Sequence, residues 1–139
     1  MKTRFRPACI AAIVLAVILS FPVCASAATE YDIEPYFVNF YSLNASLSIS
    51  QSGCAKVSVK ASLRDKTLRA DLESSLQRLE NGRWVDVKTW STEGSSLFTF
   101  TEQWYVISGY SYRVEVTAKV YDGSTLIENA SQVSTTVTY

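Results

Sequence analysis

The sequence predicts an all-β protein that folds as an antiparallel β-sandwich of about seven strands. Three observations lead to this fold class. Apolar and polar residues alternate with a period of two along most of the chain after residue 42. Turn-forming residues separate the alternating segments at short, regular intervals. The segment 28–139 has the length of a single domain, large enough to bury a core without disulfides or metal.

The first 27 residues are typical of a secretory signal peptide, which we expect to be helical. Basic residues precede an apolar run at 8–23, and small residues lead to a cleavage site between Ala27 and Ala28. The apolar run is shorter than the roughly 20 residues that span a bilayer. The sequence therefore predicts a secreted protein, free or associated with the cell wall, without stable membrane insertion after cleavage.

After the signal we expect a leader segment at 28–37 and one sandwich domain at 38–139. The first two strands, 43–50 and 55–64, alternate strictly and flank a turn at 51–53. They are predicted to pair as an antiparallel ribbon with one buried face. The residues of the second strand expected to face the core are Ala55, Val57, Val59, Ala61 and Leu63, and those expected outside are Lys56, Ser58, Lys60, Ser62 and Arg64.

The stretch 68–80 admits two interpretations. Its leucines fall on a helical stripe that Asn81 and Gly82 could end. However, an Asn-Gly pair between two apolar-rich segments is the strongest short-range signal for a β-hairpin, since both turn positions require positive φ. We therefore expect a hairpin with strands on both sides of residues 81–82.

Three further segments complete the expected sandwich. The segment 97–106 is rich in aromatic residues and threonine, 112–120 alternates cleanly, and 133–139 closes the chain as a last strand. Asp122 and Gly123 mark a tight turn between the last two segments. The aromatic side chains Phe98, Phe100 and Trp104 are expected in the core.

The segment 107–116, Ile-Ser-Gly-Tyr-Ser-Tyr-Arg-Val-Glu-Val, resembles the tyrosine-corner strand of fibronectin type III and immunoglobulin-like domains. The resemblance implies an immunoglobulin-like or fibronectin-like sandwich in which the Tyr112 hydroxyl bonds back to the upstream corner.

A longer stretch is similar to small exported proteins of Gram-positive, clostridia-like bacteria, a group without an established activity. The matching residues are Leu-Gln-Arg at 76–78, Asn-Gly-Arg-Trp at 81–84, Trp90 and Gly-Tyr-Ser-Tyr-Arg-Val at 109–114.

Composition argues against most catalytic and metal chemistry. The chain contains no histidine, and Cys54 is the one cysteine after residue 27, so histidine-based triads and histidine or thiolate metal sites are not expected. We expect no cofactor and no metal. A hydrolase built on two carboxylates is the remaining enzymatic alternative, with Glu73, Glu93 and Glu102 as candidates, although each is expected to be a solvated charge.

Charge also limits the expected partners. Residues 28–139 carry ten Lys and Arg against thirteen Asp and Glu, a net charge of −3. Binding to nucleic acid, which requires a basic surface, is therefore not expected. The lone Cys54 is expected to be buried, and the alternative is a Cys54-linked dimer.

The hairpin suggests a binding surface. With uninterrupted pairing from the turn, the opposed residues are Glu80 and Arg83, Leu79 and Trp84, Leu76 and Val87, and Glu73 and Trp90. Trp84, Asp86, Lys88 and Trp90 would then share the outer face, whereas Leu72, Leu76, Val85 and Val87 would face the core. The alternatives are that a bulge switches the faces, or that another segment covers the rings.

Two kinds of function remain for an exported sandwich of this composition. The first is a non-catalytic binding or interaction module whose sheet face or end loops contact a protein or glycan partner. The alternative is a carbohydrate-binding domain that uses exposed Trp84 and Trp90.

Overall fold

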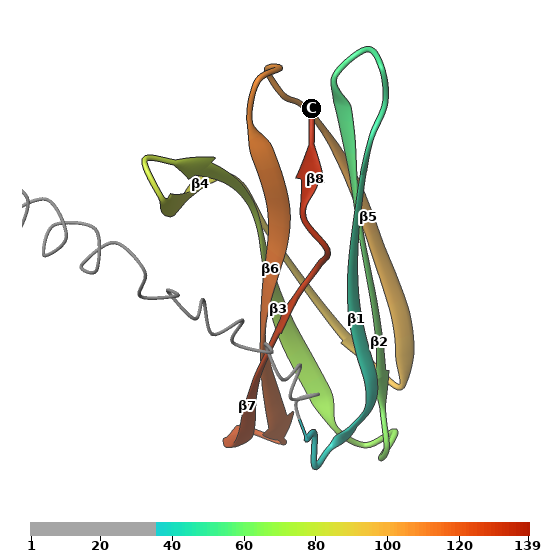
Figure 1. Ribbon diagram of the computed structural model, residues 1–139. Coiled ribbons are helices and arrows are strands. Elements are labelled where there is room, and N and C mark those ends of the chain that lie inside the picture. The colour runs from blue at the N-terminus through green and yellow to red at the C-terminus, as the bar shows by residue number, and fades with distance from the viewer. Residues whose placement is uncertain (1–35) are drawn as a thin grey trace, which may run out of the picture. The chain divides into compact units, whose positions relative to one another are not determined.

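The protein is a sandwich of two antiparallel sheets (Figure 1). The structure, a computed structural model, describes residues 36–139, so the signal peptide and most of the leader lie outside the described residues. The strands are β1 (Phe40–Ile49), β2 (Cys54–Leu63), β3 (Arg69–Glu80), β4 (Arg83–Ser95), β5 (Leu97–Tyr105), β6 (Ser111–Asp122), β7 (Thr125–Val133) and β8 (Val137–Thr138).

The three-stranded sheet has the order β1-β2-β5, and the five-stranded sheet has the order β4-β3-β6-β7, with β8 also pairing with β6. All neighbouring strands are antiparallel. The predicted immunoglobulin-like or fibronectin-like sandwich is therefore confirmed. Among residues 36–139, the structure holds no helix long and apolar enough to cross a bilayer.

The core lies between the sheets and is built by the period-two alternation of the central strands. The predicted inward residues of β2 are all buried, with at most 6% of their surface exposed. Strand β6 contributes the second wall of the core with Val114, Val116, Ala118 and Val120, each fully buried. For β2 and β6, the buried face is therefore the one that the sequence predicts.

The Asn81-Gly82 hairpin is also confirmed, and the helical interpretation of 68–80 is excluded. Asn81 and Gly82 have φ values of 50° and 77°, as a type I′ turn requires. Two leucines of the stripe, Leu72 and Leu76, are nevertheless buried in the core, because both lie on the inward face of β3.

The C-terminal part differs from the prediction. The turn at Asp122 leads directly into β7, a strand that the sequence did not indicate, and the expected last strand is reduced to β8. Between them, the backbone N–H and hydroxyl of Ser134 bond to the carbonyl and N–H of Val114, which interrupts the regular pairing. The Ser134 hydroxyl thus takes the place of a backbone acceptor for the Val114 N–H. The alternation of apolar and polar residues does not reveal such a bond.

The tyrosine corner is present. The Tyr112 hydroxyl donates a 2.7 Å hydrogen bond to the carbonyl of Ile107, and the ring is 1% exposed. This bond ties the start of β6 to the chain that leaves β5, as the resemblance to fibronectin-like domains implies.

Replacement of Tyr112 by Phe removes this bond and leaves the Ile107 carbonyl without its partner. We expect a loss of about 1 kcal/mol in the free energy of unfolding, measured by urea denaturation of the purified protein. The variant Tyr110→Phe, which keeps the corner bond, is the control. Equal stability of Tyr112→Phe and the unmodified protein would contradict the role of this bond.

Ser74 is a polar residue in the core of β3. Its side chain is 1% exposed, and its hydroxyl has no hydrogen-bond partner among the described residues. The neighbouring Ser75 instead points outward and bonds to Thr89 at 2.9 Å. The two serines therefore allow a matched comparison.

We expect Ser74→Ala to raise the free energy of unfolding by about 1 kcal/mol, because it removes a buried hydroxyl that lacks a partner. Ser75→Ala is expected to change it by less than about 0.5 kcal/mol. Urea denaturation of both variants tests this, and a destabilised Ser74→Ala variant would show that the hydroxyl does make a compensating contact.

Candidate functional site

The β3–β4 hairpin keeps the predicted register only near its turn. Glu80 pairs with Arg83, and Leu79 pairs with Trp84, as expected. A β-bulge then shifts the pairing, since Gln77 faces Asp86 whereas its neighbour Leu76 faces Lys88. Val87 is the extra residue of the bulge.

The bulge reverses the predicted orientation of the residues beyond it. The predicted pairs of Leu76 with Val87 and of Glu73 with Trp90 are wrong, because one inserted residue exchanges the two faces of a strand. Lys88 and Trp90 instead lie opposite the inward-facing residues Leu76 and Ser74.

Trp90 is therefore part of the sandwich and not of an exposed binding face. Its ring packs edge-on against Phe100 of β5, with 6.4 Å between the ring centroids, and lies against the core. The Lys88 ammonium lies 4.8 Å from the ring centroid of Trp104. Trp104 itself is 40% exposed, so its predicted core position is wrong.

Trp84 and Asp86 stay on the outer face of the five-stranded sheet, as predicted, but they are engaged with neighbouring side chains. The Arg113 guanidinium lies 4.3 Å from the Trp84 ring centroid and donates to the side-chain carbonyl of Gln77. The Gln77 amide in turn donates to Asp86 and Glu115. This network explains the positions of Trp84 and Asp86 without a ligand.

The predicted carboxylate candidates do not form one group. Glu73 and Glu93 line a hollow of about 540 Å³ on the outer face of the five-stranded sheet, whereas Glu102 belongs to β5 of the other sheet. Arg69 forms ion pairs with Asp71 at 2.6 Å and with Glu93 at 3.0 Å. Within residues 36–139, no group of three or more Cys, Asp or Glu side chains is arranged to hold a metal ion.

The outer face of the three-stranded sheet is a regular polar array. Cross-strand register places its residues in rungs that run across β1, β2 and β5. Ser58 exchanges a 3.2 Å hydrogen bond with Thr101, and the Ser46 hydroxyl donates to the Ser58 carbonyl. The three central rungs are Asn44, Lys60 and Thr99; Ser46, Ser58 and Thr101; and Ser48, Lys56 and Gln103.

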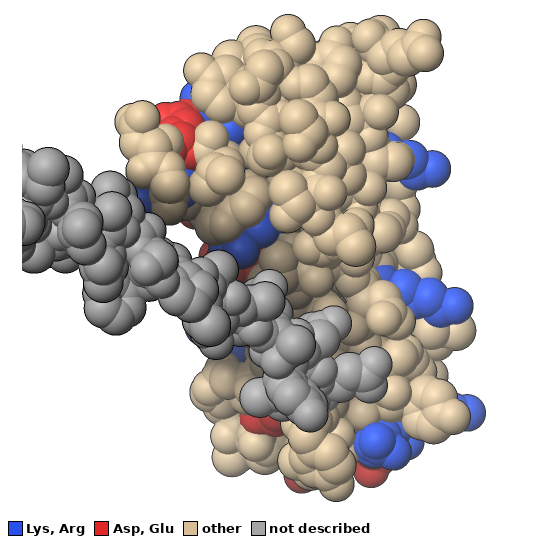
Figure 2. All heavy atoms as spheres, viewed as in Figure 1, with Lys and Arg blue, Asp and Glu red and all other residues tan. Residues whose placement is uncertain are grey.

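This array carries charge of one sign. Lys56 and Lys60 are exposed on β2, and Arg64 follows directly after the strand on the same side. Each of these residues lies four positions after the previous one, a spacing of about 13 Å in extended chain. Figure 2 shows Lys and Arg side chains projecting along the right-hand side of the molecule, where the three-stranded sheet lies.

A second hollow, of about 340 Å³, adjoins one end of this array. Tyr36, Tyr41 and Arg64 line it, together with Asn44 and Gln132. Sequence reasoning missed this group because Tyr36 falls in the predicted leader and Tyr41 precedes the alternating part of the first strand. The available signal was the presence of two tyrosines beside a strand that begins with polar outward residues.

Cys54 begins β2 and is neither fully buried nor fully exposed. It has no disulfide partner among residues 36–139. A Cys54-linked dimer stays a prediction.

No protein-family model and no curated protein matches this sequence. Among solved structures, a glycosyl hydrolase family 2 member from Bacteroides cellulosilyticus DSM 14838 is similar over 68% of this chain and 15% of its own, with 13% identity and a TM-score of 0.43. A likeness at this level carries no argument about the activity of the present chain.

The bulge makes the two hairpin tryptophans unequal in their contribution to stability. We expect Trp90→Ala to lower the free energy of unfolding by about 3 kcal/mol, because the ring packs between the sheets against Phe100. Trp84→Ala is expected to lower it by about 1 kcal/mol, mainly through the lost contact with Arg113. Denaturant titration of both variants measures the difference, and a larger loss for Trp84→Ala would contradict the assigned orientations.

Proposed function

We propose that this protein is an exported, non-catalytic binding module that contacts its partner through the outer face of the three-stranded sheet. The observation that carries the proposal is the array on this face, in which Lys56 and Lys60 alternate with neutral hydrogen-bonding side chains. The predicted signal peptide supports a location outside the cell membrane.

The array is suited to binding because strand backbones hold its side chains at fixed spacings. Hydroxyl and amide groups offer both donors and acceptors, and ordering of short Ser, Thr and Asn side chains costs less entropy than ordering of long ones. A partner with repeated polar groups could therefore bind without rearrangement of the sheet.

Charge narrows the class of partner. The described domain contains ten Lys and Arg and ten Asp and Glu, so its total charge is balanced. The rungs of the three-stranded face nevertheless include two lysines and no carboxylate. Such a local excess of positive charge favours a partner with negative charge and accelerates its association.

The proposal is tested by binding of the purified protein to cells and envelope preparations of the source organism. Substitution of both Lys56 and Lys60 by Gln is expected to weaken binding about tenfold, since each exposed charge pair contributes up to about 1 kcal/mol. Binding should also fall as salt is raised from low ionic strength, because ions screen exposed charges.

The matched control is Lys119→Gln, which removes a lysine from the outer face of the five-stranded sheet. Its binding is expected to equal that of the unmodified protein. If the control weakens binding as much as the double variant, or if the double variant binds normally, the three-stranded face is not the contact surface.

A further inference from the structure

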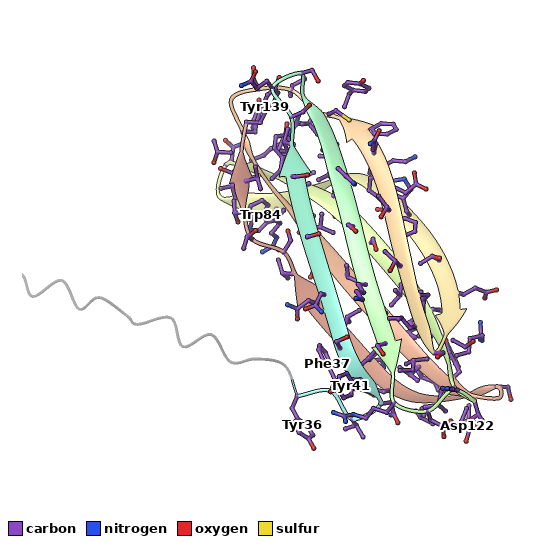
Figure 3. All side chains as sticks on the ribbon, turned by 90° about the vertical axis from the view of Figure 1, so that its right-hand side faces the viewer. Tyr36, Phe37, Tyr41, Trp84, Asp122 and Tyr139 are labelled. Carbon is purple, nitrogen blue, oxygen red and sulfur yellow. The ribbon has the colours of Figure 1, made fainter. Side chains whose placement is uncertain are left out.

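The hollow lined by Tyr36, Tyr41 and Arg64 lies where β1 begins, beside the end of the three-stranded face. Figure 3 shows Tyr36, Phe37 and Tyr41 together at this end of the sheet, with Tyr36 projecting away from it. The volume of about 340 Å³ falls within the roughly 300–1,000 Å³ of small-molecule sites.

The backbone that carries the two tyrosines is held in place. Phe37 and Phe40 pack edge to face, with 5.8 Å between ring centroids, and Phe40 is fully buried. The carboxylate of Glu128 on β7 accepts hydrogen bonds from the N–H groups of Val38 and Asn39 at 3.0 and 2.7 Å. The segment is therefore fixed between the buried Phe40, the partly buried Phe37 and the neighbouring sheet.

The tyrosine rings are nevertheless exposed. A register shift between Phe40 and Ser42 makes Tyr41 the extra residue of a bulge, so its side chain points outward next to a fully buried neighbour. Tyr41 is 76% exposed, and Tyr36 is 90% exposed. Two exposed aromatic rings on an anchored backbone favour a binding role for this surface, because exposed apolar patches often mark interaction sites.

Arg64 supplies the charge of the hollow. Its guanidinium lies 5.7 Å from the Tyr41 ring centroid, and it forms no ion pair with a carboxylate among residues 36–139. The adjacent Asp65 is committed to the turn, where hydrogen bonds from the backbone N–H and hydroxyl of Thr67 lower the pKa of its carboxyl. Within the described residues, no carboxylate therefore occupies the forked donors of Arg64, a geometry that suits a bound carboxylate.

We propose that this hollow is a subsite for an acidic sugar residue of a carboxylated polysaccharide. The sugar carboxylate would pair with Arg64, and its ring would contact both Tyr36 and Tyr41. The amides of Asn44 and Gln132 would bond to its hydroxyls. The inference rests on the proposed function, because the rest of the polymer would continue over the three-stranded face.

The spacing of the cations favours a repeating polymer over a folded protein partner. Lys56 and Lys60 lie on β2 and Arg64 directly after it, at intervals of about 13 Å, with short polar side chains between them. A chain whose negative groups recur at a regular distance can meet all three at once. Such simultaneous contacts raise the overall affinity well above that of any single one.

The test is isothermal titration calorimetry of the purified protein with an oligogalacturonate of defined length and with the same oligosaccharide after reduction of its carboxyl groups. We expect the oligogalacturonate to bind at least tenfold more tightly than the reduced form. Arg64→Gln and Tyr41→Ala should each weaken binding at least fivefold. The affinity of Arg64→Lys should lie between those of the unmodified protein and Arg64→Gln, because lysine keeps the charge and lacks the forked geometry.

Arg69→Gln is the matched control, since it removes an arginine that stacks on Tyr121 of the other sheet. Its affinity is expected to be unchanged. Tyr36→Ala gives a second test at a residue outside the strands, should Tyr41→Ala disturb the start of β1; it is expected to weaken binding as Tyr41→Ala does. Circular dichroism establishes that each variant is folded before it is titrated.

The subsite and the broader binding face can fail separately. The double variant Lys56→Gln and Lys60→Gln could weaken binding to the oligosaccharide or to cell envelopes while the Tyr36, Tyr41 and Arg64 variants bind normally. That result would overturn the proposed subsite and would still support the three-stranded face as the binding surface. Absence of oligogalacturonate binding, or equal affinity for polyphosphate and oligogalacturonate with no effect of Tyr41→Ala, also overturns the acidic-sugar assignment.

Discussion

The alternation of side chains along β2 is the constraint on which the rest of the structure depends. Every second residue from Ala55 to Leu63 is buried between the sheets, and this burial fixes the register of β1 and β5 on either side. The same alternation directs the intervening lysines outward. The core and the candidate binding face are therefore two consequences of one pattern, and a shift of register by one residue would destroy both.

Much of the fold was predictable because it follows from local rules. Alternation identified the central strands, the Asn81-Gly82 pair identified the hairpin, and Tyr112 identified the corner between β5 and β6. These features depend on short segments whose conformations are set by residue type. Strand β7 was missed because the residues after Asp122 mix polar and apolar side chains at the edge of the sheet, where one face meets solvent.

The candidate site was less predictable from the sequence, because two β-bulges change which side chains reach the surface. A bulge at Val87 and another at Tyr41 each insert one residue, and neither is marked by glycine or proline. The first moved Trp90 from an expected outer face into the sandwich. The second brought Tyr41 to the surface beside Arg64, which lies 23 residues later in the chain. Such a shift arises in the pairing between two strands, so alternation within one strand cannot reveal it.

The bulge in β4 also divides the hairpin into two parts with different tolerance to change. Beyond Val87, toward β5, inward residues such as Trp90 and Gly94 are constrained by the opposite sheet, and a Cβ atom at Gly94 would meet the Phe98 ring at 2.6 Å. Toward the turn, Trp84 and Asp86 instead contact side chains of their own sheet, Arg113 and Gln77. Changes near the turn are therefore expected to disturb contacts within the five-stranded sheet, whereas changes at the base are expected to disturb the packing between the two sheets.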